Sequence, residues 1–183
     1  MNYKGALHSL ARKIIGSRAR RLYNVTVKLF EKGFNVPPPI GFIEKRDASF
    51  YFSSFIENSE NLWVAYKECQ RPKELANGFA STLAGWHMKG AVHGDLKWSN
   101  ILVRKNVSGR EFFFVDLDQT RLYAAPNVKG IKKDIRKFYA YSIRLDRFGG
   151  LGAQEWTKRE FIPAYLSFLP DDVKGNIIDI VNG

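Results

Sequence analysis

The spacing of hydrophobic residues predicts a helix close to the start of the chain. Four of these residues recur every three or four positions and share one helical face: Leu22, Val25, Leu29 and Phe30. Ser17 is a suitable N-cap for this helix. Gly33 and the three prolines at positions 37–39 end it, because proline cannot continue a helix.

A second helical pattern covers residues 72–88 and is more hydrophobic than the first. Its large residues recur at helical spacing, with small ones beside them: Leu75, Phe79, Leu83 and Trp86, and Ala76, Ala80 and Ala84. Pro72 suits the first turn of such a helix. We predict a buried helix whose small residues allow close packing by its neighbours.

Further helices are predicted on both sides of this one. Residues 61–70 form a short helix, and a longer one after Pro126 has one hydrophobic face: Ile131, Ile135, Phe138 and Tyr139. Two helices close the chain at 156–168, with a break at Pro163, and at 171–181. The glycine-rich stretch 149–152 does not follow a strand, so we interpret it as a flexible break and not as a phosphate-binding loop.

Short hydrophobic runs predict strands between the helices. Residues 40–43 and 49–56 are two strands with a turn at 45–47. Residues 101–103 and 112–115 are two more. The mixture of separate strands and helices predicts an α+β fold.

Composition limits the class of protein. The chain has 183 residues, of which 45% are hydrophobic and 14% aromatic, which is enough for a globular domain with a core. The single cysteine, Cys69, excludes an internal disulfide framework. No uninterrupted hydrophobic run approaches the roughly 20 residues of a membrane span, and residues 1–16 lack the hydrophobic core of a secretion signal. We therefore expect a cytoplasmic protein.

The formal net charge of +11 favours acidic partners: phosphates, anionic lipid surfaces or nucleic acid. Charge alone does not choose among them, and a lysine-rich surface of no special function is the plainer interpretation. Residues 1–16 are basic, with Leu7, Leu10 and Ile14 at helical spacing. This stretch is either an amphipathic helix on an anionic membrane surface or, as we favour, a helix packed on the domain.

Candidate chemistry is concentrated in the segment HGDLKWSN at residues 93–100 and in FFFVDLD at 112–118. Asn100 follows Asp95 by five positions, and Asp116 follows Asn100 by sixteen. Phosphoryl transfer needs one carboxylate for the proton of the attacking hydroxyl, and an amide oxygen and a second carboxylate for magnesium. Asp95, Asn100 and Asp116 supply these groups in that order.

These two segments resemble the catalytic loop and metal-binding segment of the protein-kinase-like superfamily. Gly94 stands where protein kinases have arginine, and Leu117-Asp118 where they have Phe-Gly. The pattern from His93 to Leu102 is most similar to the lipopolysaccharide kinase (Kdo/heptose kinase) family. Its members phosphorylate inner-core sugars of bacterial lipopolysaccharide. The resemblance runs from about Ser17 to the helix around Asp134.

The resemblance implies a protein-kinase-like fold with a truncated small lobe at residues 1–60 and a mostly helical large lobe at 61–183. It implies ATP and Mg²⁺ as cofactors, bound between the lobes. Asp95 is then the catalytic base and Lys97 contacts the transferred phosphate. Asn100 and Asp116 hold the metal, and Ile56 and Glu57 lie at the hinge that binds adenine through backbone groups. The plainer interpretations are a solvated Lys97 and an ordinary turn at the hinge.

Neighbouring residues have two interpretations each. His87 and His93 fit buried packing or bracing residues better than ligands or catalysts. Asp134 is expected to brace the 93–100 loop from behind, as acids do in similar folds. Trp98 either forms a platform for a sugar ring or packs under the loop. Asp118 faces the same side as Asp116 if the strand continues, and then assists metal binding or pairs with Arg121.

Two parts of a complete kinase-like small lobe are not found before the first helix: a glycine-rich loop and a strand that carries a lysine. The helix also lacks the usual glutamate, since Glu31 is the first acid. We expect either a chain that starts late or a shortened relative. The leading hypothesis is a kinase of a lipopolysaccharide core sugar or glycolipid, cytoplasmic and in peripheral contact with the inner membrane, with nucleic acid disfavoured. The alternatives are a protein serine/threonine kinase-like enzyme and a non-catalytic pseudokinase that binds anionic glycolipid or nucleic acid.

Overall fold

The computed structural model describes residues 17–107, 109–150, 152–175 and 177. The stretch predicted as an amphipathic helix, residues 1–16, lies outside this part, as does the end of the helix predicted at 171–181. The chain divides into two compact units, Met1–Phe55 and Ile56–Gly183. The functional division predicted at residue 60 remains a prediction.

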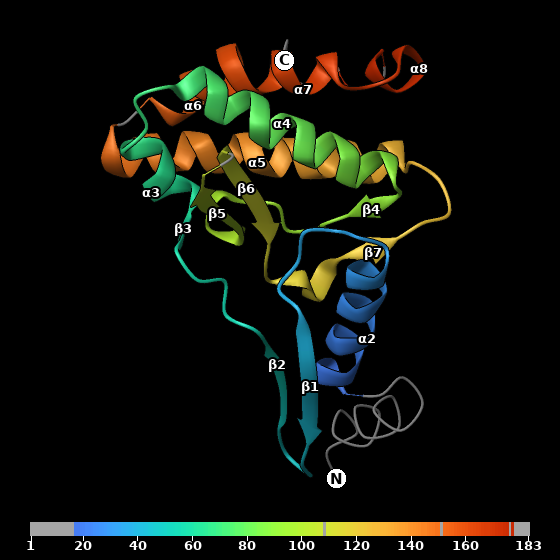
Figure 1. Ribbon diagram of the computed structural model, residues 1–183. Coiled ribbons are helices and arrows are strands. Elements are labelled where there is room, and N and C mark those ends of the chain that lie inside the picture. Colours follow the sequence, from blue (N-terminus) through green and yellow to red (C-terminus); the bar gives the residue numbers. More distant parts are fainter. Residues whose placement is uncertain (1–16, 108, 151, 176, 178–183) are drawn as a thin grey trace, which may run out of the picture. The chain divides into compact units, whose positions relative to one another are not determined.

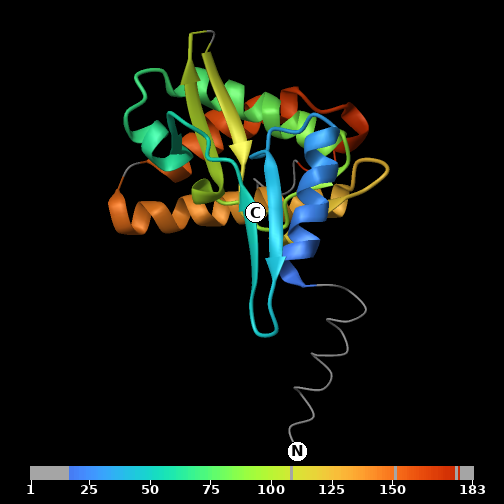
Figure 2. The same cartoon turned by 60° about the horizontal axis from the view of Figure 1, so that its bottom comes forward.

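The smaller unit consists, in its described part, of helix α2 (Arg18–Glu31) and an antiparallel hairpin of β1 (Pro39–Glu44) and β2 (Ser49–Ser53) (Figures 1 and 2). The Ser17 side chain caps α2 by accepting the backbone N–H of Arg20, as predicted. Gly33 adopts a positive φ of 70° after the helix, and the N–H of Phe34 returns to the carbonyl of Leu29. A left-handed glycine of this kind commonly ends a helix.

One detail of the predicted α2 face is wrong. Phe30 is 48% exposed, and the buried residues are Ala19, Thr26 and Leu29. Thr26 can be buried because its hydroxyl donates to the carbonyl of Leu22 at 2.8 Å, so no polar group is left unsatisfied. The prediction counted hydrophobic residues only. It therefore included Phe30 in the buried face and left out Thr26.

The larger unit is mostly helical (Figure 1). Its helices are α3 (Leu62–Lys67), α4 (Pro72–Met88), α5 (Val128–Gly149), α6 (Ala153–Trp156), a π-helical turn η3 (Thr157–Phe161), α7 (Ile162–Ser167) and α8 (Asp171–Lys174). Pro163 lies in the first turn of α7 and does not break the helix there. The glycine-rich stretch that was predicted as a flexible break lies between α5 and α6. The Asp146 carboxylate accepts the first backbone N–H groups of α6. No helix among these residues is both long and apolar enough to cross a membrane.

The core of the larger unit is built around α4. Phe79 is fully buried, and its ring centroid lies 5.3 Å from that of Phe138 on α5 and 4.8 Å from that of Phe161 on η3. The predicted hydrophobic positions of α4 are all buried, together with the three alanines beside them. Aromatic pairs at such distances add to the free energy of burial, so α4 and α5 form a rigid base for the segment between them.

Two small sheets hold that segment. Strands β3 (Ser59–Asn61), β5 (Ile101–Asn106) and β6 (Gly109–Phe114) form an antiparallel sheet in the order β3-β5-β6. Strand β4 (Ala91–Val92) pairs with β7 (Arg121–Leu122). Residues 93–100 are therefore held at both ends, by β4 before them and by β5 after them, and end in the 3₁₀ turn η1 (Trp98–Asn100).

The β5–β6 hairpin brings Asn100 and Asp116 together. Ile101 pairs with Phe114, and the N–H of Val115 donates to the carbonyl of Asn100 at 3.0 Å. A hairpin returns the chain to its starting point, so residues just outside its two ends become neighbours. The sixteen-residue spacing noted in the sequence is thus the length of a hairpin with its turn.

Candidate functional site

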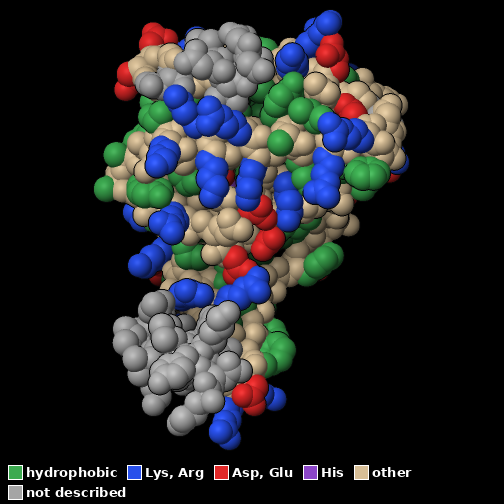
Figure 3. Space-filling model, turned by 180° about the vertical axis from the view of Figure 1, so that it is seen from behind, with side chains coloured by type: hydrophobic (Ala, Val, Ile, Leu, Met, Phe, Trp, Pro, Cys, Tyr) green, Lys and Arg blue, Asp and Glu red, His purple; other side chains and the backbone are tan. Residues whose placement is uncertain are grey.

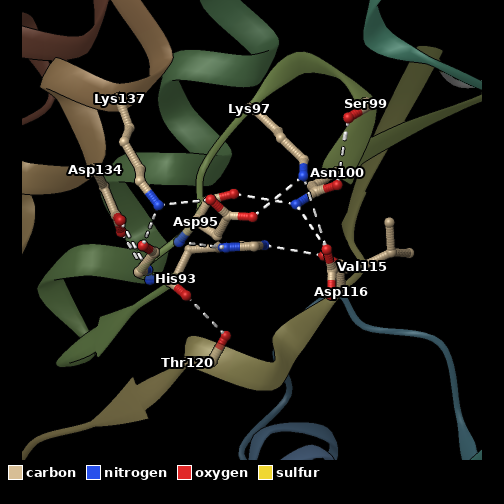
Figure 4. Close-up of polar contacts among 11 residues, drawn as sticks. His93, Asp95, Lys97, Ser99, Asn100, Val115, Asp116, Thr120, Asp134 and Lys137 are labelled. Carbon is tan, nitrogen blue, oxygen red and sulfur yellow. Dashed lines mark hydrogen bonds and ion pairs between the residues drawn. The ribbon is translucent and has the colours of Figure 1, made fainter. Parts of the chain in front are cut away.

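The 93–100 loop is supported from behind by a buried carboxylate. Asp134 on α5 has no exposed surface, and it accepts the backbone N–H of His93 at 2.7 Å and that of Gly94 at 2.8 Å (Figure 4). This confirms the predicted bracing role of Asp134. Two short hydrogen bonds to an ionisable acceptor are stronger than neutral ones, so they fix the loop backbone relative to α5.

Asp134 is itself contacted by the buried His87, and His87 is contacted in turn by the buried Tyr165. His87 Nε2 lies 3.3 Å from Asp134 Oδ2, and His87 Nδ1 lies 2.6 Å from the hydroxyl of Tyr165. Burial, and after it the charge of Asp134, raises the pKa of Tyr165, so the phenol remains protonated and can donate to His87. His87 is buried, as predicted, but it is also a hydrogen-bonded link between α7 and Asp134.

His93 braces the loop from inside, as predicted. Its Nε2 donates to the carbonyl of Val115 at 3.0 Å, and its Nδ1 accepts the backbone N–H of Asp95 at 3.3 Å. Only a neutral imidazole can donate with one nitrogen and accept with the other. Burial lowers the pKa of His93, which favours that neutral form.

The lowered pKa of His93 predicts that acid destabilises the protein. The unfolded chain takes up a proton on His93 below its ordinary value of 6.5, whereas the folded chain resists it. Stability therefore falls as the pH falls through 6.5, by at most about 1.4 kcal/mol per pH unit for one group. Urea unfolding at pH 7.5 and pH 5.5 measures the difference, and we expect it to be smaller in His93→Gln, which keeps His87. An equal pH dependence in both proteins would contradict this role.

Gly94 has a structural reason to be glycine. Its φ is +80°, and a Cβ atom at this position would lie 2.6 Å from the carbonyl oxygen of Gln119. No side chain can be accommodated there without moving the backbone of residues 117–120. The same two segments are joined by the Thr120 hydroxyl, which donates to the carbonyl of His93 at 3.2 Å.

Asp95 lies between two lysines (Figure 4). Lys137 Nζ is 2.6 Å from its Oδ1 and also donates to the Gly94 carbonyl at 3.0 Å, and Lys97 Nζ is 3.2 Å from its Oδ2. The hydrogen bond from Lys137, and then that from Lys97, lowers the pKa of Asp95 against the opposing effect of burial. The carboxylate is therefore ionised at neutral pH and fixed in orientation.

Sequence reasoning missed Lys137. A signal was present, since Lys137 follows Asp134 by three positions in a predicted helix, and residues three apart lie on the same side of a helix. An acid expected to reach the loop from that helix implies that a side chain one turn further on can reach it too.

Removing the Lys137 charge should raise the pKa of Asp95. We expect Lys137→Met to move this pKa upward, because the largest favourable contact of the ionised carboxylate is lost. NMR titration of the Asp95 carboxyl carbon measures it directly. Lys132→Met, on the same helix and without an ion pair to the described residues, is the matched control and should leave the titration unchanged. A shift of equal size in both variants would mean that the general field of α5, and not the contact, sets the pKa.

Asn100 and Asp116 lie side by side, as their spacing predicted. Asn100 Nδ2 donates to the carbonyl of Asp95 at 3.1 Å and approaches Asp116 Oδ2 at 3.4 Å (Figure 4). Among the residues that the structure describes, the contact of Asn100 Oδ1 is with the Ser99 hydroxyl, at 3.4 Å. Asp116 has a φ of +58°, an uncommon conformation for a residue other than glycine. The side chain of Asp116 is 48% exposed.

This pair fits a magnesium ion. Mg²⁺ prefers oxygen ligands, and it is commonly bound by one or two protein side chains, with phosphates and water completing its shell. Asn100 Oδ1 and the Asp116 carboxylate are such ligands. The described residues contain no cluster of three or more His, Cys, Asp or Glu that could hold a metal without a ligand's help. Because two side chains fill only part of the six-oxygen shell of Mg²⁺, a metal here is expected to bind together with a phosphate-bearing molecule.

The remaining candidates lie in different places. Lys97 is 32% exposed and its Nζ is 3.9 Å from Asp116 Oδ2, so it borders both carboxylates. Ile56 is buried and its carbonyl accepts the Ser59 hydroxyl at 2.6 Å, whereas Glu57 is exposed. No polar contact among the described residues joins these two to the 93–100 loop, so the hinge role of Ile56 and Glu57 remains a prediction.

The structure decides between the two interpretations of Trp98 and corrects the one given for Asp118. Trp98 is fully buried, stacks on Phe138 at 5.4 Å between ring centroids and donates to the Ser142 hydroxyl, so it packs under the loop and offers no platform for a sugar. The strand does not continue past Asp116, because Leu117–Gln119 form a 3₁₀ turn. The premise that Asp118 shares a strand face with Asp116 is therefore wrong.

Comparison with a family model gives a match over residues 5–165, and the model describes the lipopolysaccharide kinase (Kdo/WaaP) family. The chain is also similar to a 3-deoxy-D-manno-octulosonic acid kinase of Mannheimia succiniciproducens, with 28% identity over 102 residues. That match covers 53% of this chain and 42% of the relative. The chain thus matches less than half the length of this relative.

Solved structures resemble the chain in fold. WaaP in complex with acyl carrier protein matches with a TM-score of 0.65 and 18% identity, over 90% of this chain and 74% of that one. The Rio2 kinase of Chaetomium thermophilum, solved as an ADP/Mg²⁺-phosphoaspartate complex, matches with a TM-score of 0.52 and 16% identity, over 90% and 53%. These likenesses confirm the predicted protein-kinase-like α+β fold.

Proposed function

Because the chain belongs to the lipopolysaccharide kinase (Kdo/WaaP) family, we propose that it transfers a phosphate group from ATP to a hydroxyl of an inner-core sugar of lipopolysaccharide. The observation that carries the proposal is the setting of Asp95. Two lysines hold this ionised carboxylate. The backbone carbonyl of Asp95 accepts a hydrogen bond from the Asn100 side chain, which also approaches Asp116. A base beside two metal-binding side chains is the set that phosphoryl transfer requires.

The residues divide the work as follows in this proposal. Asp95 accepts the proton of the acceptor hydroxyl while the oxygen forms a bond to the γ-phosphorus of ATP, and the bond to the β–γ bridging oxygen breaks to release ADP. Lys97 contacts the transferred phosphate, where charge develops in the transition state. Asn100 and Asp116 hold Mg²⁺, which neutralises phosphate charge when bound.

Lys137 has a positioning role. It orients the Asp95 carboxylate through Oδ1 and holds the adjacent Gly94 carbonyl. With Oδ1 engaged, Oδ2 is the oxygen shared with Lys97 and available to the acceptor. Because the pKa of Asp95 is lowered, the base is ionised over the whole neutral range. The hinge residues Ile56 and Glu57, and the lobes 1–60 and 61–183, complete the proposed nucleotide-binding arrangement.

The acceptor we propose is a glycolipid with acidic groups, reached by peripheral contact with an anionic membrane surface on the cytoplasmic side. The formal charge of +11 suits such a surface. Kdo is the first acceptor to test, because the sequence relative is a 3-deoxy-D-manno-octulosonic acid kinase, and heptose is the second. Nucleic acid has no part in this proposal.

The test is phosphate transfer from radiolabelled ATP with and without Mg²⁺. Core oligosaccharide acceptors ending in Kdo or in heptose are compared with a serine-containing protein such as casein. We expect magnesium-dependent labelling of one sugar acceptor and none of the protein. Labelling of casein alone would favour a protein kinase-like enzyme. Failure to bind or hydrolyse ATP would favour a non-catalytic pseudokinase.

A further inference from the structure

A pocket of about 540 Å³ lies on the side of the 93–100 loop that faces α5. Gly94 forms part of its wall, and the other walls come from the segment after Asp116 and from the start of α5. All of these residues belong to the larger unit. The volume is within the range of sites that bind small ligands.

The pocket is lined by cations. Arg121, Lys129 and Lys133 line it, against one carboxylate, Asp118. Within the described residues, none of the three cations forms an ion pair or a side-chain hydrogen bond. Three neighbouring positive charges without partners repel one another, and an anion among them would remove that repulsion.

The sequence places two of these cations, Lys129 and Lys133, on one side of α5 together with a further basic residue, Arg136. Lys129, Lys133 and Arg136 recur every three or four positions, opposite the buried residues Ile131 and Ile135. Figure 3 shows a row of Lys and Arg side chains across the larger unit, with acidic side chains close to it. Lys129 and Lys133 are the members of this face that also line the pocket.

The pocket reaches Gly94, the residue before the proposed base Asp95. Asp95 lies between Asn100 and Asp116 on one side and the α5 residues Asp134 and Lys137 on the other (Figure 4). The proposed metal and nucleotide phosphates belong to the first side. Lys133 precedes Lys137 by about one helical turn, and Gly94 is adjacent to the base. A molecule in the pocket can therefore present a hydroxyl to Asp95 from the side opposite the nucleotide.

We propose that this pocket binds an acidic group of the acceptor, a carboxylate or a phosphate monoester, through Lys133, Lys129 and Arg121. This inference rests on the proposed function, because it assigns the acceptor site of that reaction. The close packing of α5 on β4 defines the pocket, since a Cβ atom on Gly130 would lie 2.5 Å from the Val92 side chain. The cations are thus carried by rigid elements, which suits selective binding of a charged group.

Direct binding tests the pocket without relying on turnover. Calorimetric titration with Kdo, with its carboxyl-reduced derivative and with a heptose phosphate compares the wild type with the double variant Lys129→Ala/Lys133→Ala. We expect the variant to bind the acidic sugars at least about tenfold more weakly, as expected for the loss of charge-assisted contacts. The control, Lys132→Ala, removes a cation of α5 that does not line the pocket and should bind like the wild type.

The outcomes are distinct. Weaker binding of Kdo but not of heptose phosphate identifies a carboxylate as the ligand, and the reverse identifies a phosphate. Equal binding of Kdo and its reduced derivative, together with no effect of the double variant on either acidic sugar, overturns the proposal. So does equal weakening by Lys132→Ala. Acidic-sugar binding that depends on Lys129 and Lys133, without any phosphate transfer, supports the pocket and contradicts the proposed function alone.

Where transfer is observed, kinetics give a second readout. The double variant should raise the KM for the acidic acceptor at least about tenfold and leave the KM for ATP unchanged, because the lost contacts bind the acceptor only. A rise in the KM for ATP of the same size would place the cations at the nucleotide and overturn the assignment.

Discussion

Replacement of Asp95 by Asn should lower kcat by about 10²–10⁴-fold, the usual contribution of a positioned general base. An amide keeps the size of the carboxylate and can still accept from Lys137 or Lys97 through its oxygen. It cannot take the proton of the attacking hydroxyl. The contacts with the two lysines, at 2.6 Å and 3.2 Å, contribute to this loss. They orient the carboxylate and neutralise its charge, and a neutral amide loses the ionic part of both.

The measurement is the initial rate of sugar phosphorylation, with circular dichroism to show that the fold persists. Asp47→Asn is the matched control, since Asp47 is exposed in the β1–β2 turn of the smaller unit. We expect the control to retain the wild-type rate. Near-normal turnover in Asp95→Asn would contradict the assignment of the base. If Asp95→Asn does not fold, Asp95→Glu serves in its place, because it keeps the negative charge but moves the carboxylate away from its position.

Replacement of Asp134 by Ala should cause the largest loss of stability. The N–H groups of His93 and Gly94 both lose their acceptor in a site without solvent exposure. An unsatisfied buried group costs about 1–3 kcal/mol, so the free energy of unfolding should fall by about 2–6 kcal/mol. The substitution also removes the hydrogen-bond partner of His87 Nε2, so the series of contacts from Tyr165 through His87 no longer reaches residue 134.

Urea denaturation followed by tryptophan fluorescence measures this loss. Asp134→Asn, which keeps one carbonyl oxygen, should lie between Asp134→Ala and the wild type. Asp171→Ala, an exposed acid at the start of α8, should differ from the wild type by less than about 0.5 kcal/mol. If Asp134→Ala is as stable as this control, the loop is held by other contacts and the bracing role is wrong.

The helices and strands were largely predictable because their signals are local. Hydrophobic spacing, Ser17 and Gly33 located α2, and Pro72 located the start of α4. Errors arose where a polar side chain replaced a hydrophobic one in the core, as Thr26 does while Phe30 is exposed. The turn at Leu117–Gln119 was missed because the strand ends at Asp116, which adopts the αL conformation. This conformation is usually indicated in a sequence by glycine, and the residue here is aspartate.

The spacing of Asp95, Asn100 and Asp116 determined the candidate site, since a tight loop and one hairpin are enough to bring these three residues together. Partners that arrive from α5 were decided only by the tertiary structure. Asp134 was expected there by resemblance, but Lys137 on Asp95 and the cations of the pocket depend on how α5 is rotated about its axis and how closely it approaches β4. Trp98 shows the same limit, because its burial depends on Phe138, forty positions later in the chain. Hydrophobic spacing encodes which face of a helix is buried, but the contacts across that face depend on the packing of the whole core.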